Sequence, residues 1–341
     1  MLKPYIKSAI SGIHLDASEA EAAMGVVMRG EATAAQIAAW LVALRLKGET
    51  PAEISGFTRA MRAAMVTLAD VPEGAVDTCG TGGDGLSTFN ISTAAALIVA
   101  ASGVPVAKHG NRAVSSQSGS ADVLGVLGFD IDPGVETVSR ALRDTGFAFM
   151  FAPRFHPAMK HAIGPRREIG VRTVFNLLGP ICNPANVKYQ IIGVFDRAWL
   201  VPLATVLGSL GANRVLVVSG PEGADELLPA GPSQVAEWNG ERVHEYKIDP
   251  ADFGLKSISI GQIHGASAEN NAAIIRGIAQ GQEGPAAETA LLNAGAALWI
   301  ADQAESIREG VAMARAAVRD GRMAALLDAA AKASRQTGGA A

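Results

Sequence analysis

Apolar and polar positions alternate at helical spacing in the first part of the chain. Apolar residues recur at intervals of three and four from Ile54 to Met65, which predicts a helix with one buried face. Capping boxes, in which a hydroxyl residue precedes an acid or amide by three positions, mark three helix starts. These boxes are Ser18 with Glu21, Thr33 with Gln36, and Thr50 with Glu53, and Pro51 stands at the first position of the third helix. We therefore expect three helices before residue 70.

The pattern changes after Asp70, Pro72 and Gly74, where short apolar segments begin to alternate with helical ones. This alternation is typical of a mostly parallel sheet with helices on both faces. The expected strands are Ala75–Asp77, Val104–Ala107, Phe147–Phe151, Tyr189–Phe195 and Val215–Ser219. The fold class is therefore α/β, with a small N-terminal α-helical domain (residues 1–70) and a large α/β domain (residues 71–335) whose sheet is flanked by helices.

Three further segments complete this organisation. Asn239 and Gly240 separate two alternating stretches, which predicts one antiparallel hairpin. Helices are expected from about Asn270 onward, and helices from about residues 160–185 are expected to join the small domain. The small polar residues at 336–341 predict a flexible tail.

Composition excludes several classes of protein. The chain has 341 residues, a net charge of −4 and 5% aromatic residues, so it lacks the basic surface and the stacking groups that bind nucleic acid. Cys79 and Cys182 lack the spacing of a zinc site or the density of a disulfide scaffold. The apolar run at 94–101 is much shorter than the ~20 residues of a membrane span. We expect a soluble cytoplasmic protein without a membrane partner.

A glycine-rich segment from Asp77 to Gly85 follows the first expected strand and precedes a helix. Glycine lets backbone amides approach an anion, and a helix N-terminus adds unpaired N–H groups and partial positive charge. Asn90, Ser92 and Thr93 add side-chain donors there. The segment matches neither the Walker nor the dinucleotide pattern, and the alternative is an ordinary turn followed by a helix cap.

A second polar segment, Lys108 to Ser120, directly follows another expected strand. Ligands of open α/β sheets bind at the carboxyl ends of strands, where lysine and arginine complement phosphate oxygens. A solvated loop is the alternative. Asp225 and Glu226 also follow an apolar strand and offer the oxygen ligands that Mg²⁺ prefers, although an isolated acidic pair is more often solvated surface.

Together these segments resemble the anthranilate phosphoribosyltransferases. The resemblance covers nearly the whole chain. The motifs that carry it are GTGGD from Gly80, NIST from Asn90, KHGNRAVSS from Lys108, SADVLGVLG from Ser120, RREIGVRTVFNLLGP from Arg166, ADE from Ala224 and LLNAGAAL from Leu291. The family transfers the phosphoribosyl group of phosphoribosyl pyrophosphate (PRPP) to anthranilate in tryptophan biosynthesis, so this activity is the expectation here.

The resemblance also assigns roles to residues. Those expected around PRPP are Gly80, Gly83, Asp84, Thr88, Asn90, Ile91, Ser92, Thr93, Lys108, His109, Gly110, Asn111, Arg112, Ala113, Val114, Ser115, Ser116 and Ser120. Those expected to bind anthranilate are Gly80, Asn111 and Arg166, and those expected to take part in catalysis are Lys108, His109, Asn111 and Arg166. Two Mg²⁺ ions per subunit are expected on Ser92, Asp225 and Glu226, and a homodimer is expected through the helical domain.

Elementary chemistry agrees with part of this assignment. The arginine fork of Arg166 suits a benzoate carboxylate, whereas an Arg166–Arg167 pair without the resemblance would be a solvated helix face. A neutral aromatic amine needs no strong base, so stabilisation of the leaving pyrophosphate should dominate, and no general base is assigned.

Two other classes of protein are alternatives to this family, and three residues depart from the family pattern. A pyrimidine nucleoside phosphorylase shares the overall fold and would use phosphate as its nucleophile. A nucleic-acid-binding relative would be basic and would lack these motifs. The departures from the family pattern are Gln117, Pro165 and Ser219, which leave the acceptor pocket open to change.

Overall fold

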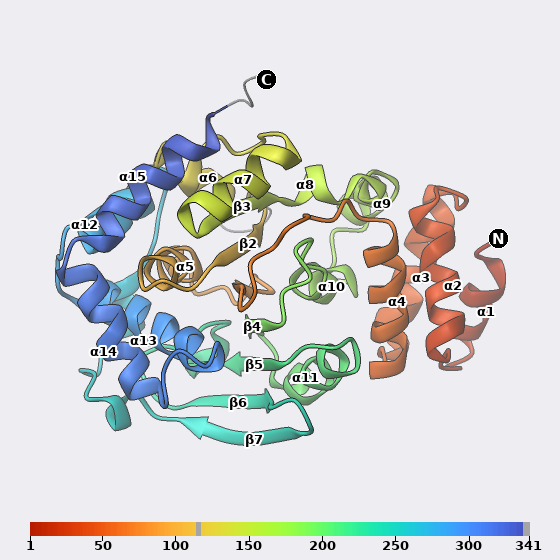
Figure 1. The fold of residues 1–341 in the computed structure, drawn as a ribbon. Helices are drawn as coiled ribbons and strands as arrows, with labels where there is room; N and C mark the ends of the chain where they lie inside the picture. The colour runs from red at the N-terminus through yellow and green to blue at the C-terminus, as the bar shows by residue number, and fades with distance from the viewer. Residues whose placement is uncertain (114–116, 337–341) are drawn as a thin grey trace.

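Four helices form the N-terminal part of the protein. The computed structural model describes residues 1–113 and 117–336, and Figure 1 shows these helices beside a larger α/β unit. They are α1 (Lys3–Ile10), α2 (Ala17–Met28), α3 (Ala34–Lys47) and α4 (Pro51–Ala63). The expectation of three helices missed α1, which begins after Leu2 without a side-chain cap and so carries no capping signal.

The helix starts follow local side-chain chemistry. The boxes of Thr33 with Gln36 and of Thr50 with Glu53 are confirmed. The predicted box of Ser18 with Glu21 is wrong, because α2 begins two residues earlier with a box formed by Asp16 and Glu19. A carboxylate caps as well as a hydroxyl does, and Asp16 accepts hydrogen bonds from two amides of the first turn.

The apolar face expected in the third predicted helix is present in α4. Ile54, Phe57 and Met61 are buried against α2 and the neighbouring helices, whereas Met65 lies beyond the last helical residue. Later helices extend this packing, because α9 (Lys160–Ile169) packs against α2 and α3, and α10 (Phe175–Ile181) contacts α4. The domain boundary at residue 70 itself stays a prediction.

The sheet has seven strands in the order β3-β2-β1-β4-β5-β6-β7. Its strands are β1 (Val76–Gly80), β2 (Val106–Gly110), β3 (Phe147–Phe151), β4 (Tyr189–Gly193), β5 (Arg214–Ser219), β6 (Ser233–Trp238) and β7 (Val243–Ile248). The first five are parallel, and β6 and β7 form the expected antiparallel hairpin at one edge. The mostly parallel sheet expected from the sequence is thus confirmed.

Strands β1 and β2 extend further than their apolar residues predicted. The ladder between β1 and β4 continues to Gly80 opposite Gly193, and that between β2 and β3 continues to Gly110 opposite Phe151. Backbone pairing, which is independent of side-chain polarity, therefore carries both strands into the polar motifs. As a result Lys108 and His109 lie inside β2 instead of in the loop after it.

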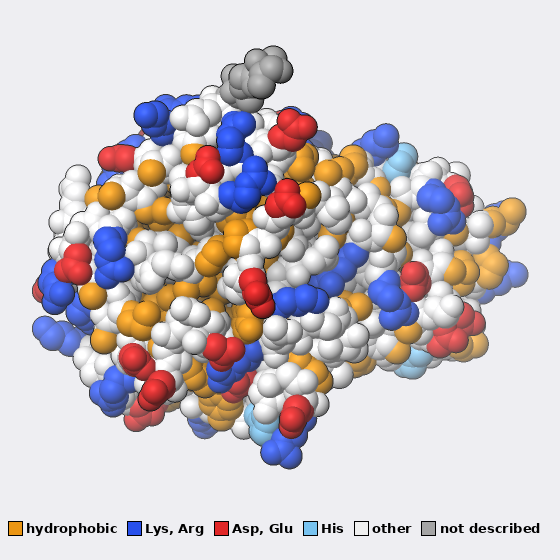
Figure 2. Space-filling view, in the orientation of Figure 1, with side chains coloured by type: hydrophobic (Ala, Val, Ile, Leu, Met, Phe, Trp, Pro, Cys, Tyr) orange, Lys and Arg blue, Asp and Glu red, His pale blue; other side chains and the backbone are white. Residues whose placement is uncertain are grey.

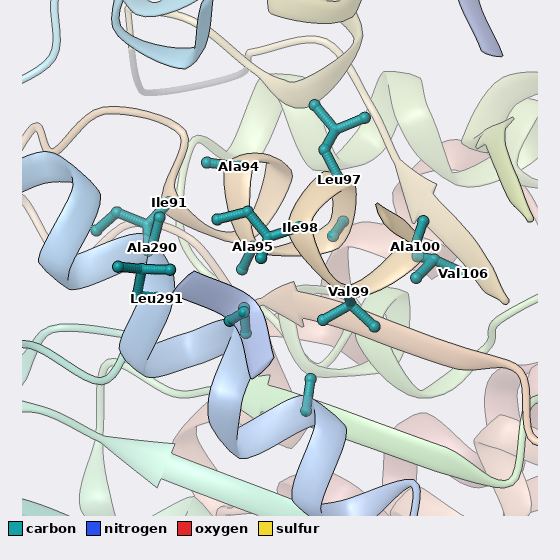
Figure 3. Close-up of a cluster of buried hydrophobic side chains, with 14 of the residues drawn as sticks. Ile91, Ala94, Ala95, Leu97, Ile98, Val99, Ala100, Val106, Ala290 and Leu291 are labelled. Carbon is teal, nitrogen blue, oxygen red and sulfur yellow. The ribbon is translucent and has the colours of Figure 1, made fainter. Parts of the chain in front are cut away.

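Helices cover both faces of the sheet, and the two faces belong to different cores. Successive residues of a strand point to opposite faces, and in β5 Leu216 and Val218 join one core while Val215 and Val217 join the other. The first core includes α5 (Ile91–Ala101) packed against Ala290 and Leu291 of α13 (Figure 3). The second core joins the sheet to α11 and to the N-terminal helices, so the helical part is fixed to one face of the sheet.

The remaining elements connect and cover this framework. The other α-helices are α6 (Ser120–Val126), α7 (Val135–Thr145), α8 (Ala152–Phe155), α11 (Leu200–Ser209), α12 (Ala268–Ala279), α13 (Pro285–Ile300), α14 (Ile307–Arg319) and α15 (Arg322–Ser334). The 3₁₀ turns are η1 (Pro157–Met159), η2 (Arg197–Trp199), η3 (Pro221–Gly223), η4 (Pro250–Phe253) and η5 (Ile260–Ile263). None of the helices in the described parts of the chain is long and apolar enough to span a membrane.

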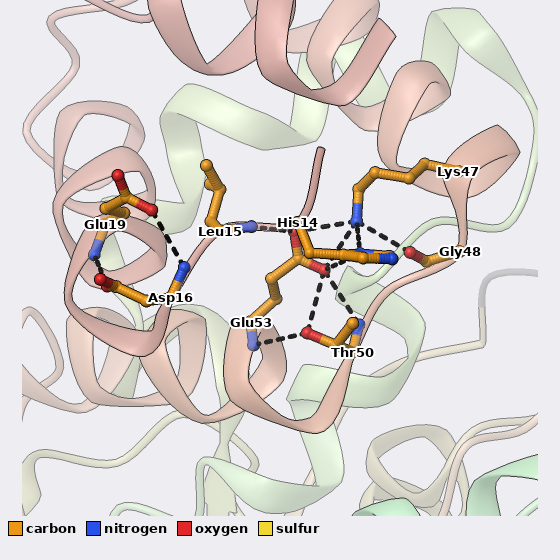
Figure 4. Close-up of polar contacts among 8 residues, drawn as sticks. All are labelled: His14, Leu15, Asp16, Glu19, Lys47, Gly48, Thr50 and Glu53. Carbon is orange, nitrogen blue, oxygen red and sulfur yellow. Dashed lines mark hydrogen bonds and ion pairs between the residues drawn. The ribbon is translucent and has the colours of Figure 1, made fainter. Parts of the chain in front are cut away.

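A buried ion pair joins the helices of the N-terminal part (Figure 4). The Glu53 and Lys47 side chains are 0% and 2% exposed, and their closest oxygen and nitrogen atoms are 2.7 Å apart. The Glu53 carboxylate also accepts hydrogen bonds from the amides of Leu15 and Thr50. Burial alone would raise the pKa of Glu53, but the hydrogen bonds from Lys47 and these two amides lower it. The pair therefore fixes α3, α4 and the start of α2 to one another.

Lys47→Met should destabilise the helical part by about 3–5 kcal/mol, because it leaves the Glu53 charge buried without its partner. Urea unfolding followed by circular dichroism measures this loss. Arg29→Met is the matched control, since the Arg29–Glu31 pair is half exposed and should contribute less than about 1 kcal/mol. Equal destabilisation by the two substitutions would contradict the prediction.

Candidate active site

Three loops that contain predicted site residues leave the sheet at the carboxyl ends of its parallel strands. Strands β1, β2 and β5 are parallel, so their carboxyl ends at Gly80, Gly110 and Ser219 lie along one side. The strand order places β1 between β2 and β4, at the point where successive connections leave in opposite directions. Ligand sites of open α/β sheets form at this type of position.

Asp225 is held against the first glycine-rich loop. Its Oδ2 atom accepts a hydrogen bond of 2.6 Å from the Gly82 amide. A Cβ atom on Gly80 would come within 2.4 Å of the same oxygen, so a larger residue cannot replace this glycine without displacing Asp225. The structure thus brings the predicted PRPP residue Gly80 together with the predicted metal ligand Asp225.

The other end of this loop is fastened to a distant segment of the chain. The Phe89 amide donates to the Ile263 carbonyl, and the Gly265 amide donates to the Ser87 carbonyl. Asn90 accepts a 2.8 Å hydrogen bond from Asn271 and donates to the Ser118 carbonyl of the second loop. Asn90 therefore joins the two predicted phosphate loops, and its side chain does not cap α5 as the sequence had allowed.

Lys108 is buried beneath the N-terminus of α5. Its ammonium group donates to the Thr78 carbonyl at 2.6 Å and to the Ser92 hydroxyl at 3.2 Å. Burial lowers the pKa of Lys108, and the nearby Asp77 carboxylate opposes this change. Lys108 thus places positive charge under Ser92, a predicted metal ligand, and its side chain is 2% exposed.

The second loop is closed by Asp122, which the sequence reasoning did not single out. The Asp122 carboxylate accepts hydrogen bonds from the amides of Ala113 and Gly119 and from the Arg112 guanidinium. The Asn111 carbonyl accepts from Ser120 in addition. Val114, Ser115 and Ser116, three predicted PRPP residues, lie outside the described residues.

Five other residues predicted to bind PRPP lie between β1 and α5, in α5, or at the end of β2. Asp84 accepts a hydrogen bond from the Leu86 amide, and Thr88 pairs with His264 in an isolated bridge. Ile91 and Thr93 are buried, and the Thr93 hydroxyl is enclosed without a hydrogen-bond partner among the residues that the structure describes. Gly110 packs so closely on Ser120 that a Cβ would come within 2.2 Å of its hydroxyl oxygen.

Asp225 and Glu226 are buried carboxyl groups with raised pKa values. Burial, together with repulsion from Asp84, raises the pKa of Asp225 to about 7. Burial and the neighbouring Asp225 raise the pKa of Glu226 well above its ordinary value, whereas Lys108 and the Ser92 amide lower it. Such closely spaced carboxylates are stabilised as anions when a cation lies between them.

This donor set fits Mg²⁺. Carboxylate and hydroxyl oxygens are hard ligands, and Mg²⁺ commonly combines one or two carboxylates with water and substrate phosphates. Within residues 1–113 and 117–336, no cluster of three or more His, Cys, Asp or Glu side chains is arranged to hold a metal.

Arg166, the predicted ligand of the anthranilate carboxylate, lies in the last turn of α9. Its guanidinium carbon is 5.1 Å from the centre of the Phe175 ring. Burial lowers the pKa of Arg166. Among the described residues its guanidinium makes no hydrogen bond or ion pair.

Sequence reasoning also missed a buried support between β1 and β2. The Asn183 side-chain amide donates to Asp77 at 2.7 Å and to the Ala107 carbonyl at 2.9 Å. Burial raises the pKa of Asp77, which lies beneath the first loop. Asn183 belongs to none of the recognised motifs, so only its position in the fold reveals this role.

Two of the three departures are buried. Ser219 ends β5 fully buried, and within residues 1–113 and 117–336 its hydroxyl has no hydrogen-bond partner. Pro165 is buried within α9 immediately before Arg166, whereas Gln117 is exposed.

The chain is similar to known proteins along most of its length. The family model described as "Glycosyl transferase family, a/b domain" matches residues 72–324, and the one described as "Glycosyl transferase family, helical bundle domain" matches residues 3–65. Anthranilate phosphoribosyltransferase of Moorella thermoacetica is 49% identical over 96% of this chain and 97% of its own length.

Solved structures agree with these matches. Anthranilate phosphoribosyltransferase of Thermus thermophilus has a TM-score of 0.92 at 45% identity, over 97% of this chain and 99% of that one. The enzyme of Saccharomyces cerevisiae in complex with PRPP and Mg has a TM-score of 0.88 at 26% identity, over 98% and 97% of the two chains.

His109 and His156 form a buried pair whose ring centres are 5.0 Å apart. Burial, with repulsion from His156, lowers the pKa of His109 to about 3, and burial lowers that of His156 to about 4. Both rings are therefore neutral in the folded protein at pH 7. Protonation favours the unfolded chain, where the pKa is about 6.5. The stability that these neutral rings confer is complete above about pH 6.5 and falls as the pH drops toward 4.

His156→Gln should make the melting temperature less dependent on pH between about 6.5 and 4.5 than in the unmodified protein, because one such ring is removed. Melting curves across this range measure the slope. His264→Gln, which changes an exposed histidine, should retain the original slope. A His156→Gln slope equal to that of the unmodified protein would exclude this source of acid sensitivity.

Proposed function

The chain belongs to the anthranilate phosphoribosyltransferase family, and from this premise we propose that it transfers the 5-phosphoribosyl group of PRPP to anthranilate. The products are N-(5-phosphoribosyl)anthranilate and pyrophosphate, in a step of tryptophan biosynthesis. The matched relative covers 96% of the chain at 49% identity. The observation that carries the proposal is the meeting of two glycine-rich loops and the Asp225–Glu226 pair at one edge of the sheet.

PRPP binds, in this proposal, across the β1–α5 and β2–α6 loops. The glycines of the first loop let its backbone approach an anion closely, and the N-terminus of α5 favours an anion. Lys108 adds charge beneath that terminus, and Asn90 keeps the two loops together. The proposed contact residues are those expected from the sequence, Val114, Ser115 and Ser116 included.

Asp225, Glu226 and Ser92 would hold Mg²⁺, with two ions per subunit as the finer proposal. When bound, Mg²⁺ supplies positive charge that stabilises the departing pyrophosphate. The raised pKa values of the two carboxyl groups reflect burial and repulsion, on Asp225 from Asp84 and on Glu226 from Asp225 and Asp84, which a cation relieves. The yeast relative was solved in complex with PRPP and Mg, which supports this assignment.

The chemistry is substitution at the anomeric carbon of ribose. The bond from this carbon to the pyrophosphate oxygen breaks, a bond to the anthranilate nitrogen forms, and the nitrogen loses one proton. An aromatic amine is neutral at pH 7, so its nucleophilicity does not depend on prior deprotonation. Positioning of the two substrates therefore supplies much of the rate enhancement, and no general base is assigned.

Arg166, Asn111 and Gly80 are the proposed anthranilate contacts. The guanidinium of Arg166, which lies over the Phe175 ring and makes no hydrogen bond or ion pair among the described residues, can bind the carboxylate through two hydrogen bonds. His109 is neutral at pH 7 because its pKa is about 3, so it cannot provide this positive charge. It can line the acceptor pocket only as an uncharged ring.

The purified protein should consume anthranilate in the presence of PRPP and Mg²⁺, which is measured as a loss of anthranilate fluorescence. An Asp225→Asn, Glu226→Gln double variant should lose at least ~100-fold in kcat/KM, because charge stabilisation of the leaving group is lost. Glu222→Gln is the matched control, since Glu222 is an exposed acid in the same connection and should leave activity unchanged.

Persistent fluorescence alongside an active reference enzyme would refute the acceptor assignment. Full Mg²⁺-dependent activity in the double variant would refute the metal assignment. Incubation with thymidine and phosphate provides the second comparison, because release of free base would identify a nucleoside phosphorylase instead.

We also propose that the protein forms a homodimer through its helical part. Met1, Ile10, Ile13, Val42 and Leu46 are exposed there, and Leu46 is 83% exposed. Val42 and Leu46 are four residues apart and so share one face of α3. Figure 2 shows some hydrophobic side chains at this end of the molecule, next to charged ones. Exposed apolar patches of this kind are typical of protein interfaces.

Leu46→Glu should convert the dimer to a monomer, because it places a charge in the proposed apolar interface. Light scattering after gel filtration measures the mass. Ala325→Glu adds the same charge to an exposed position of α15 and should leave the dimer intact. A dimeric Leu46→Glu protein, or a monomeric unmodified protein, would contradict the proposal.

The proposed location is the cytoplasm. Cys79 and Cys182 are both free thiols, as expected in a reducing compartment.

A further inference from the structure

Arg172 lies in the short connection between α9, which carries Arg166, and α10. Its guanidinium donates a hydrogen bond to the Gly83 carbonyl of the β1–α5 loop. The two residues are 89 positions apart in sequence. This contact links the proposed acceptor side of the site to the loop that is proposed to bind PRPP.

The backbone conformation of Gly83 allows this contact. Its φ angle of +79° lies in the left-handed region that favours glycine. A Cβ atom at this position would come within 2.5 Å of an Arg172 guanidinium nitrogen. The loop conformation and the arginine position therefore depend on each other.

A second contact helps to hold the guanidinium in place. The Arg172 guanidinium carbon is 3.9 Å from the centre of the Phe195 ring, in a cation–π arrangement. Phe195 follows β4, whose last residue, Gly193, accepts a hydrogen bond from the Thr81 amide of the same loop. The arginine is thus held by the sheet edge on one side and by the loop on the other.

We propose that Arg172 is a positioning residue for PRPP: it holds the Gly83 turn so that the amides of this loop face the substrate. This inference rests on the proposed function of the loop. Lysine cannot fully replace it, because an ammonium group can reach a carbonyl but lacks the planar face that stacks on Phe195. Arg172 also connects binding at this loop to the position of α9.

Substitution at Arg172 should leave the fold intact. Arg172 is half-buried and lines a small cavity with Arg45, Glu49 and Phe195. A shorter or uncharged side chain therefore enlarges an existing space and does not open a new one in the core.

Arg172→Met should raise KM for PRPP by about tenfold, because a hydrogen bond from a charged group to the loop is lost. KM for anthranilate and the melting temperature should change little. Arg172→Lys should recover part of the loss. Phe195→Leu should raise KM for PRPP less than Arg172→Met, and the double variant should show less than the sum of the two free-energy losses, as expected for coupled residues.

Hydrogen exchange provides a measure that does not depend on catalysis. Amides of residues 80–88 should exchange faster in Arg172→Met than in the unmodified protein. Arg197→Met, which changes an exposed arginine near Phe195, should alter neither the exchange nor KM for PRPP.

Unchanged exchange in residues 80–88, or an unchanged KM for PRPP, would overturn the role of Arg172. If the unmodified protein does not consume PRPP, the proposed function fails. In that case faster exchange in Arg172→Met would still support the inference that Arg172 holds the β1–α5 loop in place. Unchanged exchange would refute that inference.

Discussion

Close packing of Asp225 against the ends of two strands is the constraint on which the site depends. A Cβ atom on Gly193 would come within 1.4 Å of the Asp225 carbonyl oxygen, and one on Gly80 within 2.4 Å of its carboxylate. Both β1 and β4 must therefore end in glycine, so that the segment that contains Asp225 can cross over the ends of these two strands. The crossing delivers Asp225 and Glu226 to the first loop, where the Gly82 amide fixes the Asp225 side chain.

The charged groups near this crossing are neighbours of one another. Asp77 and Lys108 lie within the sheet, and Lys108 donates to Ser92 at the start of α5. Glu226 of the acidic pair lies close to both Ser92 and Lys108. Each buried charge has an opposite charge or a hydrogen-bond donor nearby, as low-dielectric surroundings require. The Mg²⁺ and pyrophosphate of the proposed reaction add charges to an environment whose donors are already oriented, which limits the reorganisation needed during catalysis.

Local signals explain which parts of this fold were predictable. The run Phe147–Phe151 predicted β3 to the residue because all five of its residues are apolar, and the first four are buried in the structure. Thr33 and Thr50 marked helix starts through contacts only three residues away. The glycine-rich motifs likewise located the loops. Asn183 contacts Asp77 across 106 positions and Arg172 contacts Gly83 across 89, so no local pattern indicated either role. Resemblance identified the family, whereas the supports beneath the motifs required the three-dimensional structure.

The pairing of residues 87–89 with residues 263–265 affects how the protein is made. Asn271, which holds Asn90, is 181 positions further along the chain. A chain emerging from the ribosome therefore completes the five parallel strands before it contains the segment that fastens the first loop. The loop acquires its final contacts late in synthesis, so incomplete chains that already contain all five parallel strands lack the segment that fastens it.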